Sequence, residues 1–216
     1  MSQPQFILIS DGGSDEKTSG AGACIVRVPE QEERYKLIGI LGPVSGSQAE
    51  LAAALIGWCF VVEYSRANSL PTGHVHWVSD NKPLLFSSSN IREWQARGWR
   101  THSERSVANR GLWEAFIELS AGQTVTVEHI RGHCGHRENE ACDRAARWIQ
   151  RKGEKLLRIH GEGRIGQLAV SAPEQAWTLL DMRRPMSALL ESTKIKDAVA
   201  EMRQIVVRQV SLPQPP

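Results

Sequence analysis

The chain has 216 residues, of which 41% are hydrophobic and 23% are charged, and its formal net charge at pH 7 is +2. This composition excludes a disordered chain, and no apolar run reaches the ~18 residues that a membrane-spanning helix needs. Because the charges nearly balance, nucleic-acid binding would have to come from a local patch. The length predicts one domain of about 150 residues with an appendage.

The first ten residues, MSQPQFILIS, lack the basic leader of a signal peptide, so we expect none. The cysteines stand at scattered spacings among helix and strand patterns, at Cys24, Cys59, Cys134 and Cys142. This is typical of a reduced protein rather than of a disulfide framework. We therefore expect a cytoplasmic protein.

The first half of the chain predicts three strands, a helix and a fourth strand. The strands are joined by short connections, as in an antiparallel meander, and cover Phe6–Ser10, Ala21–Val28 and Tyr35–Leu41. A polar loop, Gly42–Ser47, precedes a helix over Gln48–Ser65, and His74–Ser79 is the fourth strand. Because strand–helix–strand crossovers are right-handed, we expect the fourth strand beside the first and parallel to it.

The second half predicts further helices and one more strand, and then an extension. Short helices are expected over Leu84–Phe86 and Ile91–Arg97, a helix over Leu112–Leu119, a strand over Val125–Ile130 and a closing helix from about Glu138 to Lys152. The domain would thus cover residues 1–152, followed by a glycine-bearing linker over 153–172, a helical extension over 173–210 and a disordered tail over 211–216.

The extension predicts a short helix near Pro173–Arg183 and a longer one near Ser187–Arg208. The longer helix places four apolar residues on one stripe, at Ile195, Val199, Met202 and Val206. Three uses of this stripe stay open: docking onto the core of the same chain, self-association, or binding of a partner protein.

The stretch Val125–Arg147 joins a strand to a helix through a loop that carries histidines and two glycines. It has three interpretations. One is a solvated loop whose Asp143 favours the positive end of a helix. The second is a zinc site, although the paired C-x2-C ligands of structural zinc are absent. The third is a catalytic loop with a metal-binding carboxylate, which requires further carboxylates elsewhere in the chain.

Those carboxylates are present. Asp11 and Asp80 each follow a predicted strand, so the crossover places both at one edge of the sheet, where open α/β sheets bind their ligands. Glu50 lies in the first turn of a helix. In isolation the aspartates can be turn residues, and Glu50 can form a capping box with Ser47.

Four acidic side chains brought close together repel one another unless cations neutralise them. Hard oxygen ligands suit Mg²⁺ or Mn²⁺ rather than zinc. Two such ions about 4 Å apart can drive attack on a phosphodiester, one by activating water and the other by stabilising the leaving 3′-oxygen. His133, on a glycine-flanked loop, can transfer a proton near neutral pH.

Four segments carry a resemblance to a known family: SDGGS around Asp11, QAEL around Glu50, SDN around Asp80, and HIRGHCGHRENEACDRAA through His133 and Asp143. In this order, over roughly residues 5–152, they resemble the type 1 ribonuclease H family. The resemblance implies an α/β fold with a five-stranded mixed sheet, three antiparallel strands and then two parallel ones, and flanking helices. It also implies hydrolysis of the RNA strand of an RNA–DNA hybrid with two Mg²⁺ ions, for which Mn²⁺ can substitute.

The same resemblance implies the roles of single residues. Asp11, Glu50, Asp80 and Asp143 look like the metal-binding carboxylates, and His133 like the mobile histidine that assists water activation and product release. The sequence departs from the family pattern in three places, and one of them is the extension beyond Lys152, for which the resemblance implies nothing. VSGSQAEL stands where many relatives have two asparagines and an arginine, and SDEKTSGAG replaces a glycine-rich hairpin.

The segment Asn90–Arg110 has five arginines, two glutamates and two tryptophans, which gives it a local charge of +3. Such segments can bind phosphates and pack on sugars or bases. Alternatively, it is a solvated helix face whose tryptophans anchor a small core, and both roles are compatible. It resembles the basic protrusion with which some family members grip DNA. The candidate hybrid contacts are therefore Arg92, Trp94, Arg97, Trp99, Arg100 and Asn109, with Ser45, Gln48 and Asn81 nearer the carboxylates.

The leading hypothesis is a metal-dependent endoribonuclease whose partner is an RNA–DNA hybrid duplex, with no membrane partner. Two alternatives are another nuclease or strand-transfer enzyme with the same acid-lined sheet, and a non-cleaving hybrid-binding module. We expect a monomer, with self-association or a protein partner through the last helix left open.

Overall fold

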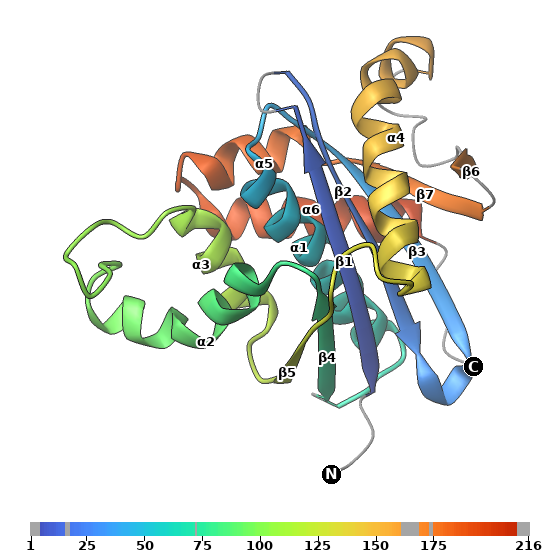
Figure 1. Cartoon of the computed structure of the whole chain (residues 1–216). Coiled ribbons are helices and arrows are strands. Elements are labelled where there is room, and N and C mark those ends of the chain that lie inside the picture. The colour runs from blue at the N-terminus through green and yellow to red at the C-terminus, as the bar shows by residue number, and fades with distance from the viewer. Residues whose placement is uncertain (1–4, 16–17, 72, 161–168, 173–174, 211–216) are drawn as a thin grey trace.

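The computed structural model describes residues 5–15, 18–71, 73–160, 169–172 and 175–210 (Figure 1). Its described strands form one sheet in the order β5-β4-β1-β2-β3-β7-β6. The predicted mixed α/β sheet with flanking helices is confirmed, and two strands, one in the predicted linker and one in the predicted extension, widen it from five strands to seven. None of the described helices is both long and apolar enough to cross a bilayer.

The central strands are β1 (Phe6–Ser14), β2 (Gly20–Val28) and β3 (Glu33–Gly42), and they form the predicted antiparallel meander. Helix α1 (Gly46–Ala67) leads from β3 to β4 (His74–Ser79), which pairs in parallel with β1. The crossover prediction is therefore confirmed. Strand β5 (Thr124–His129) continues the parallel part beside β4.

Strand β1 is longer than predicted, because it continues through Asp11, Gly12 and Gly13 to Ser14 instead of ending in a turn. The reason is that β2 pairs with it along its whole length, with Asp11 opposite Ala23. The Asp11 side chain thus projects from a rigid, paired strand rather than from a turn.

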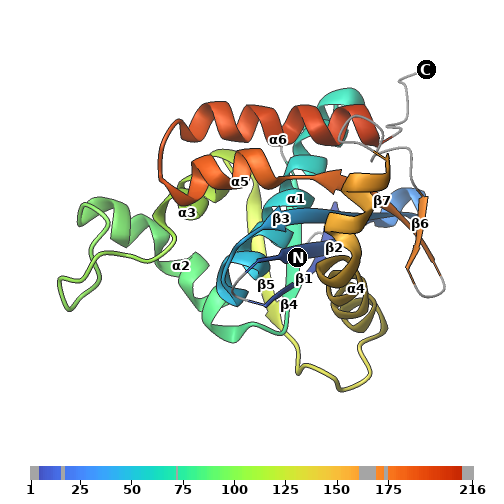
Figure 2. The same ribbon diagram turned by 90° about the horizontal axis from the view of Figure 1, so that it is seen from above.

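Helices cover both faces of the sheet. On one face lie α1, α2 (Lys82–Ala96), α3 (Arg110–Leu119), α5 (Arg183–Leu190) and α6 (Ile195–Gln209), which bury the larger apolar cluster. Helix α4 (Arg137–His160) covers the other face and buries a second cluster (Figure 2). The two short helices predicted over Leu84–Phe86 and Ile91–Arg97 are one continuous helix, α2.

The predicted linker and the predicted extension each contain a strand that the sequence does not predict. Gln175–Asp181 form β7, parallel to β3, and Ala169–Ala172 form β6, antiparallel to β7. The short helix predicted near Pro173–Arg183 is therefore wrong over these residues. Trp177 and Leu179 join the cluster under α4, whereas Leu180 joins the cluster on the opposite face. This alternation has the period of a strand.

The predicted linker over 153–172 is also wrong where the structure describes it, because α4 continues to His160 and Ala169–Ala172 form β6. Ile149 and Leu157 are both buried in the cluster under α4, and Leu156 packs against that cluster. The apolar stripe of the helix thus extends past Gly153, where an added Cβ atom would lie 3.3 Å from Ile40 Cγ1. The rest of the predicted linker and the predicted disordered tail lie outside the described residues.

The last two helices pack onto the core of the same chain. Val199, Met202 and Val206 are buried in the larger cluster, so the predicted stripe docks internally. Arg203 Nε also donates to Oε1 of the buried Glu63 on α1, at 2.5 Å. The one long helix predicted over Ser187–Arg208 is instead two helices, α5 and α6, joined by a turn.

Candidate active site

Three acidic side chains from separate elements meet at one edge of the sheet. Asp11 lies on β1, Glu50 in the first turns of α1, and Asp80 directly after β4. One oxygen from each carboxylate lies within 4.8 Å of the others. Asp11 is almost fully buried, with 6% of its surface exposed. The predicted convergence is therefore confirmed for these three carboxylates.

Gly12 permits the close approach that brings Glu50 beside Asp11. A Cβ atom at Gly12 would lie 2.3 Å from the backbone nitrogen of Glu50 and 2.3 Å from the carbonyl carbon of Ala49. Any side chain at this position would thus push the start of α1 away from β1. Glycine is needed here because it has no side chain, and not because of an unusual backbone conformation.

Ser45 caps the start of α1. Its Oγ accepts from Gln48 N at 3.4 Å, and the Gln48 side chain accepts from Ser45 N at 2.7 Å. These two bonds are a capping box. The alternative capping box between Ser47 and Glu50 is wrong, because the helix begins two residues earlier than that pairing requires. The Glu50 carboxylate is thereby left free to face Asp11.

Asp80 is held by the loop and the helix that follow β5. Asn139, which is 2% exposed, donates from Nδ2 to Asp80 Oδ2 at 3.1 Å. A Cβ atom at Gly132 would lie 2.6 Å from that same oxygen, so the loop approaches the carboxylate closely only with glycine there. Sequence reasoning missed both roles, although both residues stand in the quoted motif.

Burial and repulsion by neighbouring carboxylates make Asp11 and Glu50 weak acids. Burial, and after it the charges of Asp80 and Asp143, raise the pKa of Asp11 to about 7. Burial likewise raises the pKa of Glu50 to about 8, with the charge of Asp11 as the next cause and a hydrogen bond from Asn81 opposing them. At neutral pH the site therefore holds carboxylates whose full ionisation is unfavourable without a compensating positive charge.

The side chains fit a hard divalent cation. Glu50 Oε2 is buried and accepts no hydrogen bond from any residue that the structure describes. A buried acceptor that receives no hydrogen bond destabilises the fold unless a cation binds to it instead. The ligand set consists of oxygens alone, which suits Mg²⁺ or Mn²⁺. Among the residues that the structure describes, Asp11, Glu50 and Asp80 have their ligand atoms close enough together to hold a metal ion.

The zinc interpretation of the histidine-rich loop is not supported by the structure. Cys142 faces the core, where its thiol lies 3.8 Å from the carbonyl oxygen of Ile9, whereas Cys134 is exposed. Their side chains thus point into different surroundings.

Asp143 lies at the margin of the acidic site. It projects from the second turn of α4 and accepts from Arg147 Nε at 2.7 Å. Its charge nevertheless raises the pKa of Asp11 and of Glu50, so it faces the same site. Arg147 is a residue that sequence reasoning missed, and its i, i+4 spacing from Asp143 was the available signal.

His133 lies exposed on the loop between β5 and α4, with a positive φ of 53°. The neighbouring Gly132 contacts Asp80, so this loop passes directly beside the carboxylates.

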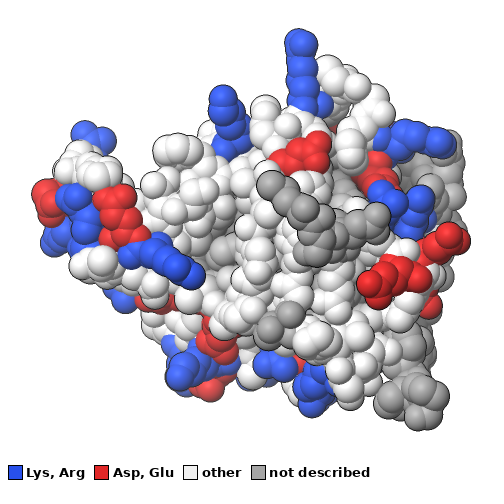
Figure 3. Space-filling model, turned by 90° about the horizontal axis from the view of Figure 1, so that it is seen from below, with Lys and Arg blue, Asp and Glu red and all other residues white. Residues whose placement is uncertain are grey.

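The basic segment Asn90–Arg110 forms a protrusion that carries less unpaired positive charge than its composition suggests. Arg97 pairs with Glu104 at 2.8 Å and with Glu93 at 3.8 Å, and Arg100 donates to the carbonyl oxygen of Glu104. Basic and acidic side chains accordingly lie side by side on the lobe at the left of Figure 3.

The tryptophans build the protrusion instead of facing solvent. Trp99 is buried and Trp94 packs against Trp113, which anchors the segment to the larger cluster. Arg110 lies over the Trp99 ring, 5.5 Å from its centroid. The small-core interpretation of both tryptophans is therefore confirmed.

The remaining candidate contacts lie in three places. Gln48 donates from Nε2 to Asn109 Oδ1 at 3.1 Å, so these two join Ser45 at one point beside α1. Asn81 caps α2, where its Oδ1 accepts from Leu84 N at 2.8 Å. Arg92, in contrast, lines a separate pocket between α2 and β5.

Comparisons with known proteins agree with this geometry. Residues 3–150 match the sequence profile of the family described as RNase H. A ribonuclease H of Pelobacter propionicus is 51% identical over 71 residues, which is 32% of this chain and 44% of that protein. A ribonuclease H of Campylobacter concisus is 30% identical over 161 residues, covering 74% of this chain and 99% of that protein.

The fold has similar solved structures. The crystal structure of LC9-RNase H1, described as a type 1 RNase H with the type 2 active-site motif, has a TM-score of 0.54. It is 19% identical, and the match covers 69% of this chain and 74% of that one. With the acidic site on the same sheet, the match over residues 3–150 establishes that the chain belongs to the ribonuclease H family.

Proposed function

We infer that this chain is an endoribonuclease that hydrolyses the RNA strand of RNA–DNA hybrids. The observation that carries the inference is the meeting of Asp11, Glu50 and Asp80 within 4.8 Å, in a chain of the ribonuclease H family. A non-cleaving binding module would have no use for a cluster of acids that repel one another.

The cofactor is a pair of Mg²⁺ ions, for which Mn²⁺ can substitute. Asp11, Glu50 and Asp80 would hold them, with Asp143 completing the ligand set from α4. Bound there, such ions supply an activated water and stabilise the leaving 3′-oxygen. The unpartnered Glu50 Oε2 and the raised pKa values of Asp11 and Glu50 support this assignment.

The chain's own groups would position the substrate and move a proton. His133 is exposed on the loop whose Gly132 lies against Asp80, so it is the candidate to move a proton at the site. The Gln48–Asn109 pair stands at the start of α1, where Gln48 is two residues before Glu50 in the chain, and would bind a backbone phosphate of the substrate. Selection of RNA over DNA would rest on the 2′-hydroxyl and on duplex shape.

The test is cleavage of an end-labelled RNA–DNA hybrid by the full chain, compared with double-stranded DNA and single-stranded RNA of the same sequence. We expect the hybrid alone to be cut, in Mg²⁺ and not in chelator. Asp80→Asn should abolish cleavage, whereas Asp197→Asn, on the exposed face of α6, should not. Cleavage of all three substrates would favour a different nuclease, and full activity of Asp80→Asn would refute the site.

We further propose that the protein acts as a monomer in the cytoplasm. Burial of the α6 stripe inside the chain supports a monomer, and the four unpaired cysteines suit a reducing compartment. Sedimentation of the full chain tests the first proposal, because a concentration-dependent dimer would contradict it.

A further inference from the structure

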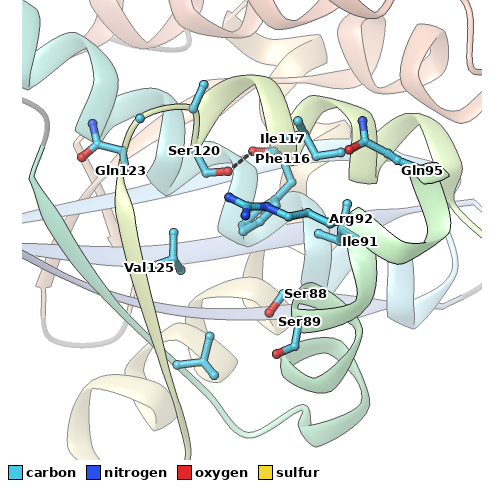
Figure 4. A pocket seen from close by; sticks show the side chains of 13 residues that line it. Ser88, Ser89, Ile91, Arg92, Gln95, Phe116, Ile117, Ser120, Gln123 and Val125 are labelled. Atoms are coloured by element: carbon cyan, nitrogen blue, oxygen red, sulfur yellow. Dashed lines mark hydrogen bonds between the residues drawn. The ribbon is translucent and has the colours of Figure 1, made fainter.

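A pocket of about 580 Å³ opens between α2, the C-terminal end of α3 and β5 (Figure 4). Its volume is within the range of about 300–1,000 Å³ that is usual for ligand sites. None of the four acidic residues lines it, so it is separate from the candidate active site.

The pocket combines an apolar lining with one free positive charge. Ile91, Phe116, Val125 and Val127 contribute the apolar surface. The Arg92 side chain extends from α2 into the space, as Figure 4 shows. No aspartate or glutamate lines the pocket, and Arg92 forms no ion pair with any residue that the structure describes. The pocket therefore favours an occupant that is apolar and negatively charged.

The pocket also borders an open sheet edge. Strand β5 is the last strand of the described sheet and pairs with β4 alone. Thr124 N donates to Gly73 O at 2.9 Å, and Ile130 N donates to Ser79 O at 3.1 Å, so the even-numbered residues of this segment point their amides inward.

In a strand, successive backbone amides alternate between the two edges. The amides and carbonyls of Val125 and Val127 therefore point outward, where the described sheet offers them no partner. Val127 is 40% exposed, which is unusual for a large apolar residue of this chain. The two residues that line the pocket thus also present the free backbone groups.

We propose that this edge and pocket bind an extended segment of a partner protein, which adds to the sheet beside β5. Main-chain bonds to Val125 and Val127 would fix the segment, as in other cases of strand addition. Alternate side chains would then lie over the pocket, an aliphatic one against Ile91 and Phe116 and an acidic one at Arg92. The charge of Arg92 favours an acidic segment over a basic one. The apolar lining favours a peptide with aliphatic side chains over a nucleic-acid phosphate.

The probe is a fluorescein-labelled octapeptide of alternating valine and aspartate, and its control has lysine in place of aspartate. Fluorescence anisotropy with the full chain measures the dissociation constant of each. We expect the acidic peptide to bind and the basic one not to bind. Arg92→Glu should weaken binding at least about tenfold, because a like charge then faces the acidic side chain.

Val127→Pro tests the backbone bonds. It removes an outward amide without removing a bond to β4, and edge strands tolerate proline at such positions. We expect it to weaken peptide binding at least about tenfold, whereas Val127→Thr, which keeps the amide and the shape, should bind like the parent chain. Cleavage of the hybrid and the circular dichroism spectrum should be unchanged in Val127→Pro.

Hydrogen exchange provides a readout that does not depend on a variant. The acidic peptide should slow exchange of the Val125 and Val127 amides, and it should leave Thr124 and Thr126 unchanged. Equal affinity for both peptides, unchanged binding by Val127→Pro and Arg92→Glu, or a dimer that the peptide dissociates would each overturn the proposal. Loss of hybrid cleavage in Asp80→Asn, by contrast, tests the nuclease alone.

Discussion

Replacing Asp11 with asparagine should stabilise the protein in the absence of divalent ions. The side chain is 6% exposed, and its pKa is raised from 3.8 to about 7 by burial and by the neighbouring carboxylates. In the unfolded chain the same carboxyl ionises near its ordinary pKa, about 4. The native state therefore binds more protons than the unfolded state between about pH 4 and pH 7, and stability falls as pH rises through this window.

The magnitude follows from the pKa. Each pKa unit corresponds to 1.36 kcal/mol, so ionising Asp11 in the metal-free protein costs on the order of 4 kcal/mol above pH 7. Asparagine loses some of the hydrogen bond that the Gly12 amide donates to Asp11 Oδ1 at 2.7 Å, which reduces the gain. We expect a net stabilisation of roughly 2–4 kcal/mol at pH 8, and a rise in Tm of roughly 5–15 °C.

The assay is thermal unfolding followed by circular dichroism, with chelator, at pH 4 and pH 8. At pH 4 the two proteins should unfold alike, because the wild-type carboxyl is protonated. Added Mg²⁺ should raise the Tm of the wild type at pH 8 and so reduce the difference in Tm between the wild type and Asp11→Asn. The control Asp197→Asn should have the Tm of the wild type at either pH. If Asp11→Asn is no more stable than wild type at pH 8, or gains equally at pH 4, the reasoning is refuted.

Further changes test other parts of the structure. Gly12→Ala should lower the single-turnover rate of hybrid cleavage by at least about 100-fold, because its Cβ would displace the start of α1. Gly13→Ala, whose Cβ would meet only ordinary contacts, should keep most of the activity, and equal losses would contradict this account. His133→Ala should lower kcat by about 10²-fold or more near neutral pH while hybrid affinity stays constant in a filter-binding assay. Met202→Ala should lower the free energy of unfolding by about 2–5 kcal/mol in urea titration, and a loss under 1 kcal/mol would mean that α6 does not share the core.

Sequence reasoning placed Asp11 and Asp80 together through a general rule. A right-handed crossover makes β4 the parallel neighbour of β1, whatever the details of the helix between them. Glu50 and Asp143 were placed by resemblance, because no rule of local sequence gives the approach of α1 or α4 to a given point on the sheet. That approach depends on space around Gly12 and on the Asn139 contact to Asp80, both of which are tertiary features.

Strand β7 shows why the secondary structure of the extension is harder to predict from the sequence. Its residues form a strand because β3 offers an edge and because the clusters above and below accept Trp177 and Leu180. The local sequence carries only a short alternation, which a helix pattern can equally contain. The ion pairs of the basic segment are hidden from the sequence for a similar reason, because Glu104 meets Arg97 after a turn whose geometry the composition does not reveal.

The pairing of β7 with β3 affects how the chain folds during synthesis. Leu37 meets Thr178 and Ile40 meets Asp181, so this edge of the central meander is completed by residues made very late. Contacts between such distant segments slow folding, because a long loop must close before they form. A nascent chain that has emerged only as far as α4 would expose the β3 edge and the apolar surface beneath α6, both of which invite aggregation. Ribosome-bound intermediates should therefore bind chaperones until the last helix emerges.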